Sequence, residues 1–210
     1  MNKVFFSPIY TAPVISLFSI LSLLVFLIDK TIVPELISSI FSAAGNQNGE
    51  MPFNWQNPLD YLKFFIHIFA HSNWTTLAYN LTVILLLGPA IEQRYGSLLL
   101  ILMFVIIAFV SAVLNAVFFD TTLLGSDGIS FLIIILTVFG KPEVPDRSII
   151  SVFILVLYVG LQINYSVQTN SFENISATFG GLCATLLAFF GLAGKKKRSV
   201  QKRKKPQALS

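Results

Sequence analysis

Charged residues are scarce in this sequence, and their scarcity excludes an ordinary soluble domain. Only 11% of the 210 residues are charged, whereas 55% are hydrophobic and 20 are phenylalanine. The mean hydropathy is +0.77. Soluble domains carry about 25% charged residues. We therefore predict an integral membrane protein whose immediate partner is the lipid bilayer.

Cysteine and histidine are also nearly absent. The single cysteine, Cys183, excludes an internal disulfide, and we expect it to be a small packed residue. The two histidines, His67 and His71, are four residues apart and would share one helix face. A zinc site needs at least three protein ligands, and no third candidate lies nearby. We therefore predict packed, hydrogen-bonded histidines, no metal site and no cofactor.

Basic residues are concentrated near the C-terminus. Eight of the 14 Lys and Arg residues lie within residues 195–205. Such a run is compatible with a nucleic-acid partner. Its position directly after an apolar run is better explained by the positive-inside rule and by anionic lipid headgroups. We predict a disordered cytoplasmic tail over residues 195–210 that contacts anionic headgroups, and no nucleic-acid partner.

Apolar runs follow one another through residues 1–194 and predict an all-α polytopic membrane domain of six transmembrane helices. They cover residues 11–28, 60–87, 98–119, 128–139, 149–163 and 175–192. The first run is compatible with a cleaved signal peptide, but further spans follow, so we predict a retained helix. Residues 31–59 form a long connection whose Leu, Ile, Phe and Trp content argues against disorder. We expect this extracytoplasmic loop to lie on the membrane.

The distribution of Lys and Arg predicts the topology. Six spans place both termini on the same side of the membrane. With the basic tail inside, Lys3, Arg94, Lys141 and Arg147 also fall inside, while the outer side receives only Lys30 and Lys63. This bias follows the positive-inside rule. We expect both termini to be cytoplasmic, in the plasma membrane of a prokaryote.

The fourth apolar run, residues 128–139, is too short to cross a bilayer. About twelve residues span roughly 18 Å as a helix, against a hydrocarbon core of about 30 Å. The helix must begin inside the membrane, where its first N–H groups need protein or a wet cavity. Asp127 stands at this start, and an ionisable group at such depth indicates a functional site. Plain N-capping by the carboxylate is the alternative.

The sequence resembles the rhomboid family of intramembrane serine proteases in several motifs that occur in the family's order. The resemblance extends from Pro13 to about Leu192. The motifs are Pro58-Leu59-Asp60-Tyr61-Leu62-Lys63, then His71, Asn73, Trp74, Leu77 and Asn80, then Gly88-Pro89, Glu92, Arg94 and Gly96, and finally Gly180 and Gly181. The resemblance implies a six-helix bundle with a short central fourth helix. At the end of the second helix, unpaired carbonyls and the Gly96 turn need partners, so we predict structural roles for Glu92 and Arg94. Gly180 and Gly181 would allow close helix packing.

The departures from the family pattern fall on its catalytic positions. The family's Gly-x-Ser-Gly motif is replaced by Gly125-Ser126-Asp127-Gly128, so Asp127 occupies the nucleophile's position. The family's base, a His just before the final glycines, is replaced by Thr178, or by Ala177 if the register slips by one residue. The only histidines are His67 and His71, so no shift of register restores the base.

The oxyanion positions are also altered. A further family His, which assists the oxyanion, is replaced by Thr76, while Asn80 remains. Ser126 is one residue from the nucleophile's position, and in a helix it would point about 100° away from the cavity. Asp127 would need a second carboxylate to form an aspartic dyad, and neither Asp120 nor Glu173 is an obvious partner. We therefore predict no intact catalytic site.

Three classes of function follow from this pattern. The favoured one is a rhomboid-like pseudoprotease that binds transmembrane segments of client proteins without cleaving them. Its cavity would offer the polar groups of Asn80, His71, Thr76 and Ser126. The alternative is an active intramembrane endopeptidase with an atypical site. A scaffold or transport-like membrane protein is the third class.

Overall fold

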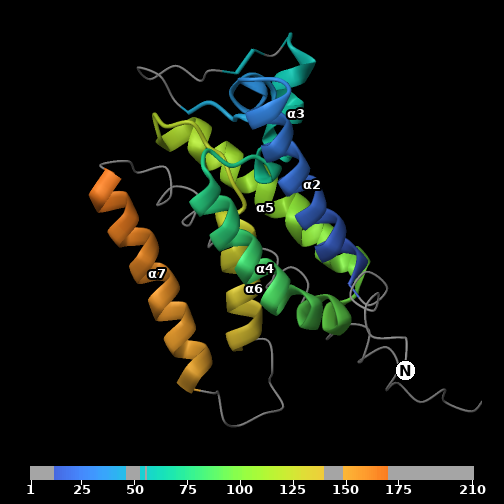
Figure 1. The fold of residues 1–210 in the computed structure, drawn as a ribbon, viewed down its shortest axis with the longest axis vertical. Helices are drawn as coiled ribbons and strands as arrows, with labels where there is room; N and C mark the ends of the chain where they lie inside the picture. The colour runs from blue at the N-terminus through green and yellow to red at the C-terminus, as the bar shows by residue number, and fades with distance from the viewer. Residues whose placement is uncertain (1–11, 46–52, 55, 140–148, 170–210) are drawn as a thin grey trace, which may run out of the picture.

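The computed structural model describes residues 12–45, 53–54, 56–139 and 149–169 (Figure 1). This part of the chain is helical, and its one β-bridge pairs Ala43 with Leu123. The elements are α2 (Pro13–Thr31), a π-helical turn η1 (Ile37–Phe41), α3 (Pro58–Ile66), a 3₁₀ turn η2 (His67–Phe69), α4 (Trp74–Tyr95), α5 (Ser97–Phe118), α6 (Asp127–Phe139) and α7 (Ile149–Thr169). The predicted all-α class is confirmed.

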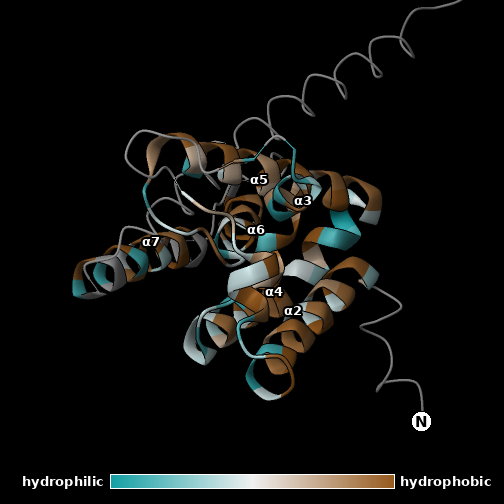
Figure 2. Cartoon of the chain, turned by 90° about the horizontal axis from the view of Figure 1, so that it is seen from above, coloured by the Kyte–Doolittle hydropathy of each residue, from teal (hydrophilic) through white to brown (hydrophobic). Residues whose placement is uncertain are grey.

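Three of the described helices are long and apolar enough to cross a membrane. They are α2, α4 and α5, with 19, 22 and 22 residues. Figure 2 shows hydrophobic residues along most of α2 and α5, with hydrophilic residues gathered at helix ends and connections. A hydrocarbon core of about 30 Å needs about 20 helical residues, so each of these helices has the required length. The predicted sixth span, residues 175–192, lies outside the described residues.

The predicted second span, residues 60–87, is wrong as a single helix. Helix α3 ends at Ile66, and the chain passes through η2 to an extended residue, Ala70. Helix α4 then begins at Trp74, because the Asn73 side chain accepts the Thr76 N–H at 2.9 Å and caps its first turn. Pro89 does not end α4, which continues to Tyr95. One missing N–H is tolerated where neighbouring helices pack closely around the backbone.

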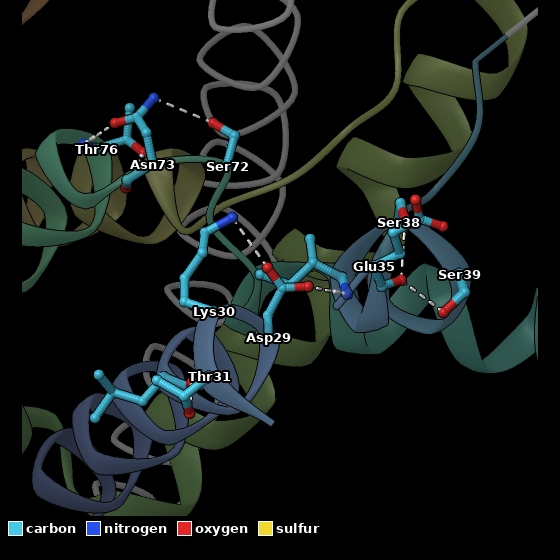
Figure 3. A network of polar contacts seen from close by, with 11 residues as sticks. Asp29, Lys30, Thr31, Glu35, Ser38, Ser39, Ser72, Asn73 and Thr76 are labelled. Carbon is cyan, nitrogen blue, oxygen red and sulfur yellow. Dashed lines mark hydrogen bonds and ion pairs between the residues drawn. The ribbon is translucent and has the colours of Figure 1, made fainter. Parts of the chain in front are cut away.

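The connection after α2 is ordered by side-chain contacts (Figure 3). The Asp29 carboxylate accepts the Ile37 N–H at 2.9 Å and forms an ion pair with Lys30 at 3.0 Å. Glu35, in the connection between α2 and η1, has a φ of +67°. Its carbonyl oxygen accepts the hydroxyls of Ser38 and Ser39, at 2.9 and 2.8 Å. The described part of residues 31–59 therefore contains regular turns, not only coil.

Glu92 joins the ends of three helices. Its carboxylate accepts the N–H groups of Val14 and Ile15, both at 3.0 Å, and the Ser97 hydroxyl at 2.6 Å. The N–H groups of the first turn of a helix have no intrahelical acceptor, so Glu92 of α4 caps α2. Gly96 has a φ of +86°, which lets the chain turn directly from α4 into α5.

Helix α6 lies among α4, α5 and α7 (Figures 1 and 2). It has 13 residues and begins one residue earlier than the fourth apolar run, at Asp127. Its side chains are buried in an almost unbroken series, with Ile129, Leu132 and Ile133 fully enclosed. Because most of α6 is apolar, its side chains are buried against the other described helices. Its first turn therefore lies among residues of the surrounding helices.

Candidate functional site

The first turn of α6 is built on a tight bend in the chain. Gly125 has a φ of +104°, a conformation that favours glycine, and its N–H donates to the His67 carbonyl at 3.1 Å. Just before it, Leu123 is paired with Ala43 through two backbone hydrogen bonds. This anchored segment places Asp127 at the start of α6, with only 5% of the side chain exposed.

The Asp127 carboxylate is held by amide groups from two other helices. Its Oδ1 accepts the Gln162 Nε2 of α7 at 2.7 Å and the Asn80 Nδ2 of α4 at 3.3 Å. The Asp127 carbonyl oxygen accepts the Tyr158 hydroxyl of α7 at 3.0 Å. The polar cluster of Asp127, Asn80, Tyr158 and Gln162 therefore links α4, α6 and α7.

Two further contacts fix the orientation of this polar cluster. The Ser130 hydroxyl donates to the Asn80 Oδ1 at 2.7 Å, so the Asn80 amide must turn its NH₂ toward Asp127. Tyr158 stacks on Tyr79 of α4, with ring centroids 5.6 Å apart. Each polar group of Asn80 thus has a partner, which makes the arrangement specific.

Ser126 and His71 form a second pair beside the polar cluster. The Ser126 Oγ lies 3.1 Å from the His71 Nε2, and both side chains are buried. The Ser126 N–H and the Asn80 Nδ2 also approach this nitrogen, at 3.4 and 3.5 Å. Because potential donors converge on Nε2, we assign the imidazole proton to Nδ1, which has no hydrogen-bond partner among the described residues.

The structure brings four predicted site residues together, namely Asp127, Asn80, Ser126 and His71, around the segment from Gly125 to Gly128. The Ser126 Oγ faces His71, and the offset of about 100° was expected only for a helical Ser126. Ser126 precedes the helix, so the angular offset between helical neighbours does not apply to it.

The other predicted positions lie elsewhere or outside the described residues. Thr76 is in the first turn of α4, where its hydroxyl donates to the Asn73 carbonyl at 3.1 Å (Figure 3). Arg94 is exposed at the end of α4, with its guanidinium 5.6 Å from the Tyr95 ring. Thr178, Gly180 and Gly181 lie outside the described residues.

Sequence reasoning missed three members of the site, Ser130, Tyr158 and Gln162. Tyr158 and Gln162 are four residues apart, so they share a face of α7 within an otherwise apolar run. Polar residues inside a transmembrane run are functional candidates by default, and this signal was present in the sequence. Ser130 lies one turn after Asp127 and is likewise a polar residue inside an apolar run.

The chemistry available at the site is that of a hydrogen-bonded carboxylate and a Ser–His contact. Among the described residues, no group of three His, Cys, Asp or Glu side chains is placed to hold a metal ion. Asp120 is exposed in the connection between α5 and α6 and does not join Asp127. The described residues therefore place no second carboxylate in the hydrogen-bonding shell of Asp127.

Comparison with family models matches the chain to the Rhomboid domain over residues 58–195. The chain belongs to the rhomboid family. The match runs from the start of α3 through the polar cluster and includes the predicted last span. With its long apolar helices, this rhomboid-family chain is an integral membrane protein. No curated protein sequence matches it significantly.

Proposed function

We propose that this rhomboid-family protein binds transmembrane segments of client proteins without cleaving them. The observation that carries the proposal is Asp127, which occupies the position of the family's serine nucleophile while its Oδ1 accepts two amide hydrogen bonds. With these two bonds, the Asp127 carboxylate serves as a hydrogen-bond acceptor. No histidine follows His71 in the sequence, so none is present to act as the family's base. The chain thus retains the family's domain while its catalytic positions have changed.

The polar cluster provides a physical reason for binding. A transmembrane segment that is partly unwound exposes backbone N–H and C=O groups, which find no partners in hydrocarbon. Asn80, Gln162, Tyr158 and Ser126 offer donors and acceptors at one place in the bundle. Rearrangement of these side chains toward a client would satisfy groups that lipid leaves unpaired.

The binding proposal is tested by crosslinking and cleavage together. Photocrosslinking residues are placed at Leu86 of α4 and Leu161 of α7, and at Leu24 of α2 as a control; all three side chains are exposed. They are expressed with a panel of tagged single-span model clients. We expect intact clients to be captured from α4 and α7 more than from α2. Capture no greater than at Leu24 would overturn the proposal.

The binding proposal includes an architecture. Six helices cross or enter the membrane, α6 begins at mid-depth, both termini are cytoplasmic, and the tail over residues 195–210 contacts anionic headgroups. The plasma membrane of a prokaryote is the expected location. Fluorescent-protein fusions at both termini should be fluorescent, and an alkaline phosphatase domain inserted after Asn48 should be active. The opposite pattern would refute this topology.

A second candidate function is an active intramembrane endopeptidase, and the Ser126–His71 contact favours it. At 3.1 Å the His71 Nε2 is within reach of the Ser126 hydroxyl proton. In such a reaction His71 takes that proton while Oγ attacks the peptide carbonyl. The proton then passes to the leaving amine, and water hydrolyses the acyl-enzyme.

The endopeptidase candidate predicts cleavage of a model transmembrane substrate by the unmodified chain. Loss of that cleavage in Ser126→Ala would assign it to the Ser126–His71 pair. Loss in Asp127→Ala, but not in Ser126→Ala, would assign it to the carboxylate. Either result would replace the binding-only proposal, whereas the absence of cleavage over an extended incubation would remove this candidate.

A further inference from the structure

The Asp127 carboxylate has no cationic partner that the membrane helices could provide. The sequence contains no Lys or Arg in residues 64–93, 95–140 or 148–194. The ion pairs formed among the described residues are Lys30 with Asp29 and Lys63 with Asp60. His71 is the nearest basic side chain, but its Nε2 faces the donors of Ser126 and Asn80 and so carries no proton. The described side chains that contact Asp127 are therefore neutral.

When Asp127 is ionised, the groups around it compensate its negative charge only in part. The N-terminus of α6 contributes roughly half an elementary charge of opposite sign. The amides of Asn80 and Gln162 add dipoles but no net charge. A buried charge is normally paired, because separation from water is costly. The remaining negative potential favours a cation over a neutral or acidic group.

Gln162 marks the place where such a cation would bind. Its Nε2 lies 2.7 Å from the Asp127 Oδ1 and comes from α7. Helix α7 packs mainly on α6 and presents an exposed apolar outer face, as at Val156 and Leu161. An ammonium or guanidinium group in place of the amide would make a charge-assisted hydrogen bond, which is shorter and stronger.

From these observations we propose that Asp127 selects clients whose transmembrane segment carries a Lys or Arg side chain. The inference rests on the client-binding function proposed above and names its substrate class. The basic side chain would displace the Gln162 amide from Oδ1 and pair with the carboxylate. A basic side chain is unfavourable in lipid, so pairing with Asp127 lowers the free energy of the client's transmembrane segment.

The selectivity is measured with clients that differ at one position. Three single-span clients carry Leu, Lys or Glu at mid-span, and their capture by the photocrosslinker at Leu161 is compared. We expect the Lys client to be captured at least about tenfold more than the Leu client, and the Glu client least. This series uses the unmodified site and does not depend on the folding of any site variant.

Variants of the polar cluster assign the selectivity to Asp127. Asp127→Asn keeps the size of the side chain but removes its charge, and it should bring the Lys-to-Leu capture ratio close to one. Gln162→Lys places a tethered ammonium beside Oδ1 and should also abolish the preference for Lys. Its matched control, Gln168→Lys, makes the same exchange at an exposed position of α7 outside the polar cluster and should keep the preference. Thermal unfolding in detergent checks that each variant is folded.

Failure of this inference differs from failure of the binding function. If Leu, Lys and Glu clients are captured equally, binding stands and the selection by Asp127 is overturned. If the Lys preference persists in folded Asp127→Asn, another group provides it, and the inference is again overturned. If no client is captured above the Leu24 control, the binding function itself is wrong.

Discussion

At the scale of the residue, two buried carboxylates each connect several helices by hydrogen bonds. Glu92 and Asp127 are both nearly buried, and each accepts hydrogen bonds from more than one helix. Glu92 closes the N-terminus of α2, whereas Asp127 collects side chains from α4 and α7. The first role is structural, and the second lies at the candidate binding site.

Replacing Glu92 should destabilise the protein much more than replacing Arg94 two residues later. Glu92→Ala leaves the N–H groups of Val14 and Ile15 without an acceptor, which we expect to cost about 2–4 kcal/mol. Arg94→Ala is the matched control: a structural role was expected from the sequence, but Arg94 is exposed, and its replacement should change stability by less than about 0.5 kcal/mol. Thermal unfolding in detergent measures both. Equal effects would contradict the capping role of Glu92.

The single change Asp127→Ser should not create a protease. The new hydroxyl would have no base, because no histidine follows His71 in the sequence and the His71 Nε2 already faces Ser126. Loss of general-base help typically lowers a rate by about 10²–10⁴. Incubation with a model transmembrane substrate, beside an active rhomboid protease, should show no product from the variant. Cleavage by Asp127→Ser would mean that another group acts as base.

At the scale of the element, the approach of α2 to α4 depends on a glycine. A Cβ at Gly88 would lie 2.6 Å from the Ile15 Cδ1 and 3.0 Å from its Cγ1, so a side chain here must displace the Ile15 side chain or the helix that carries it. Glu92, one turn further along α4, bonds to the start of α2 and holds the same pair together. The packing and the cap therefore support each other.

Gly88→Leu should lower the stability of the bundle by about 1–3 kcal/mol through overpacking. Gly160→Leu is the control: it lies on α7, and a Cβ there meets no described atom within 4 Å beyond its own stretch of helix. Because Leu favours the helix more than Gly does, Gly160→Leu should be neutral or slightly stabilising. The shift in melting temperature in detergent separates the two variants. A similar loss in both would show that α2 and α4 do not require this close contact.

At the scale of the whole molecule, catalysis in this fold would require several elements to be aligned at once. Asp127 begins α6, Thr76 lies in the first turn of α4, and Thr178 belongs to the predicted last span. Restoring one position leaves the others limiting, and the effects of such residues are not additive.

The combined variant Asp127→Ser, Thr178→His and Thr76→His tests whether the bundle still holds catalytic geometry. We expect it to cleave a model transmembrane substrate where Asp127→Ser does not, by a factor of roughly 10³ or more, because base and oxyanion help are both restored. The readout is product formation in detergent and in liposomes. No cleavage by a variant that melts like the parent protein would show that the helices have lost the alignment.

The sequence by itself determined the class of the protein and its family. Scarce charge and long apolar runs dictate helices, because only helices and closed barrels satisfy the backbone inside a membrane. The motifs between Pro58 and Gly181 were specific enough to identify the rhomboid family, which the family match over residues 58–195 confirms. Asp127, Asn80, Ser126 and His71 were recognisable as candidates for the same reason.

Only the tertiary structure decided how these residues meet. Hydropathy could not locate the break at Ala70, since apolar residues lie on both sides of it and capping by Asn73 sets the start of α4. Nor could sequence distance show that Gln162, 35 residues after Asp127, donates to its carboxylate. Such contacts depend on the packing of α7 against α6 and α4. Which residues of two packed helices touch depends on the surfaces of both helices, and the hydropathy pattern of the sequence does not specify these contacts.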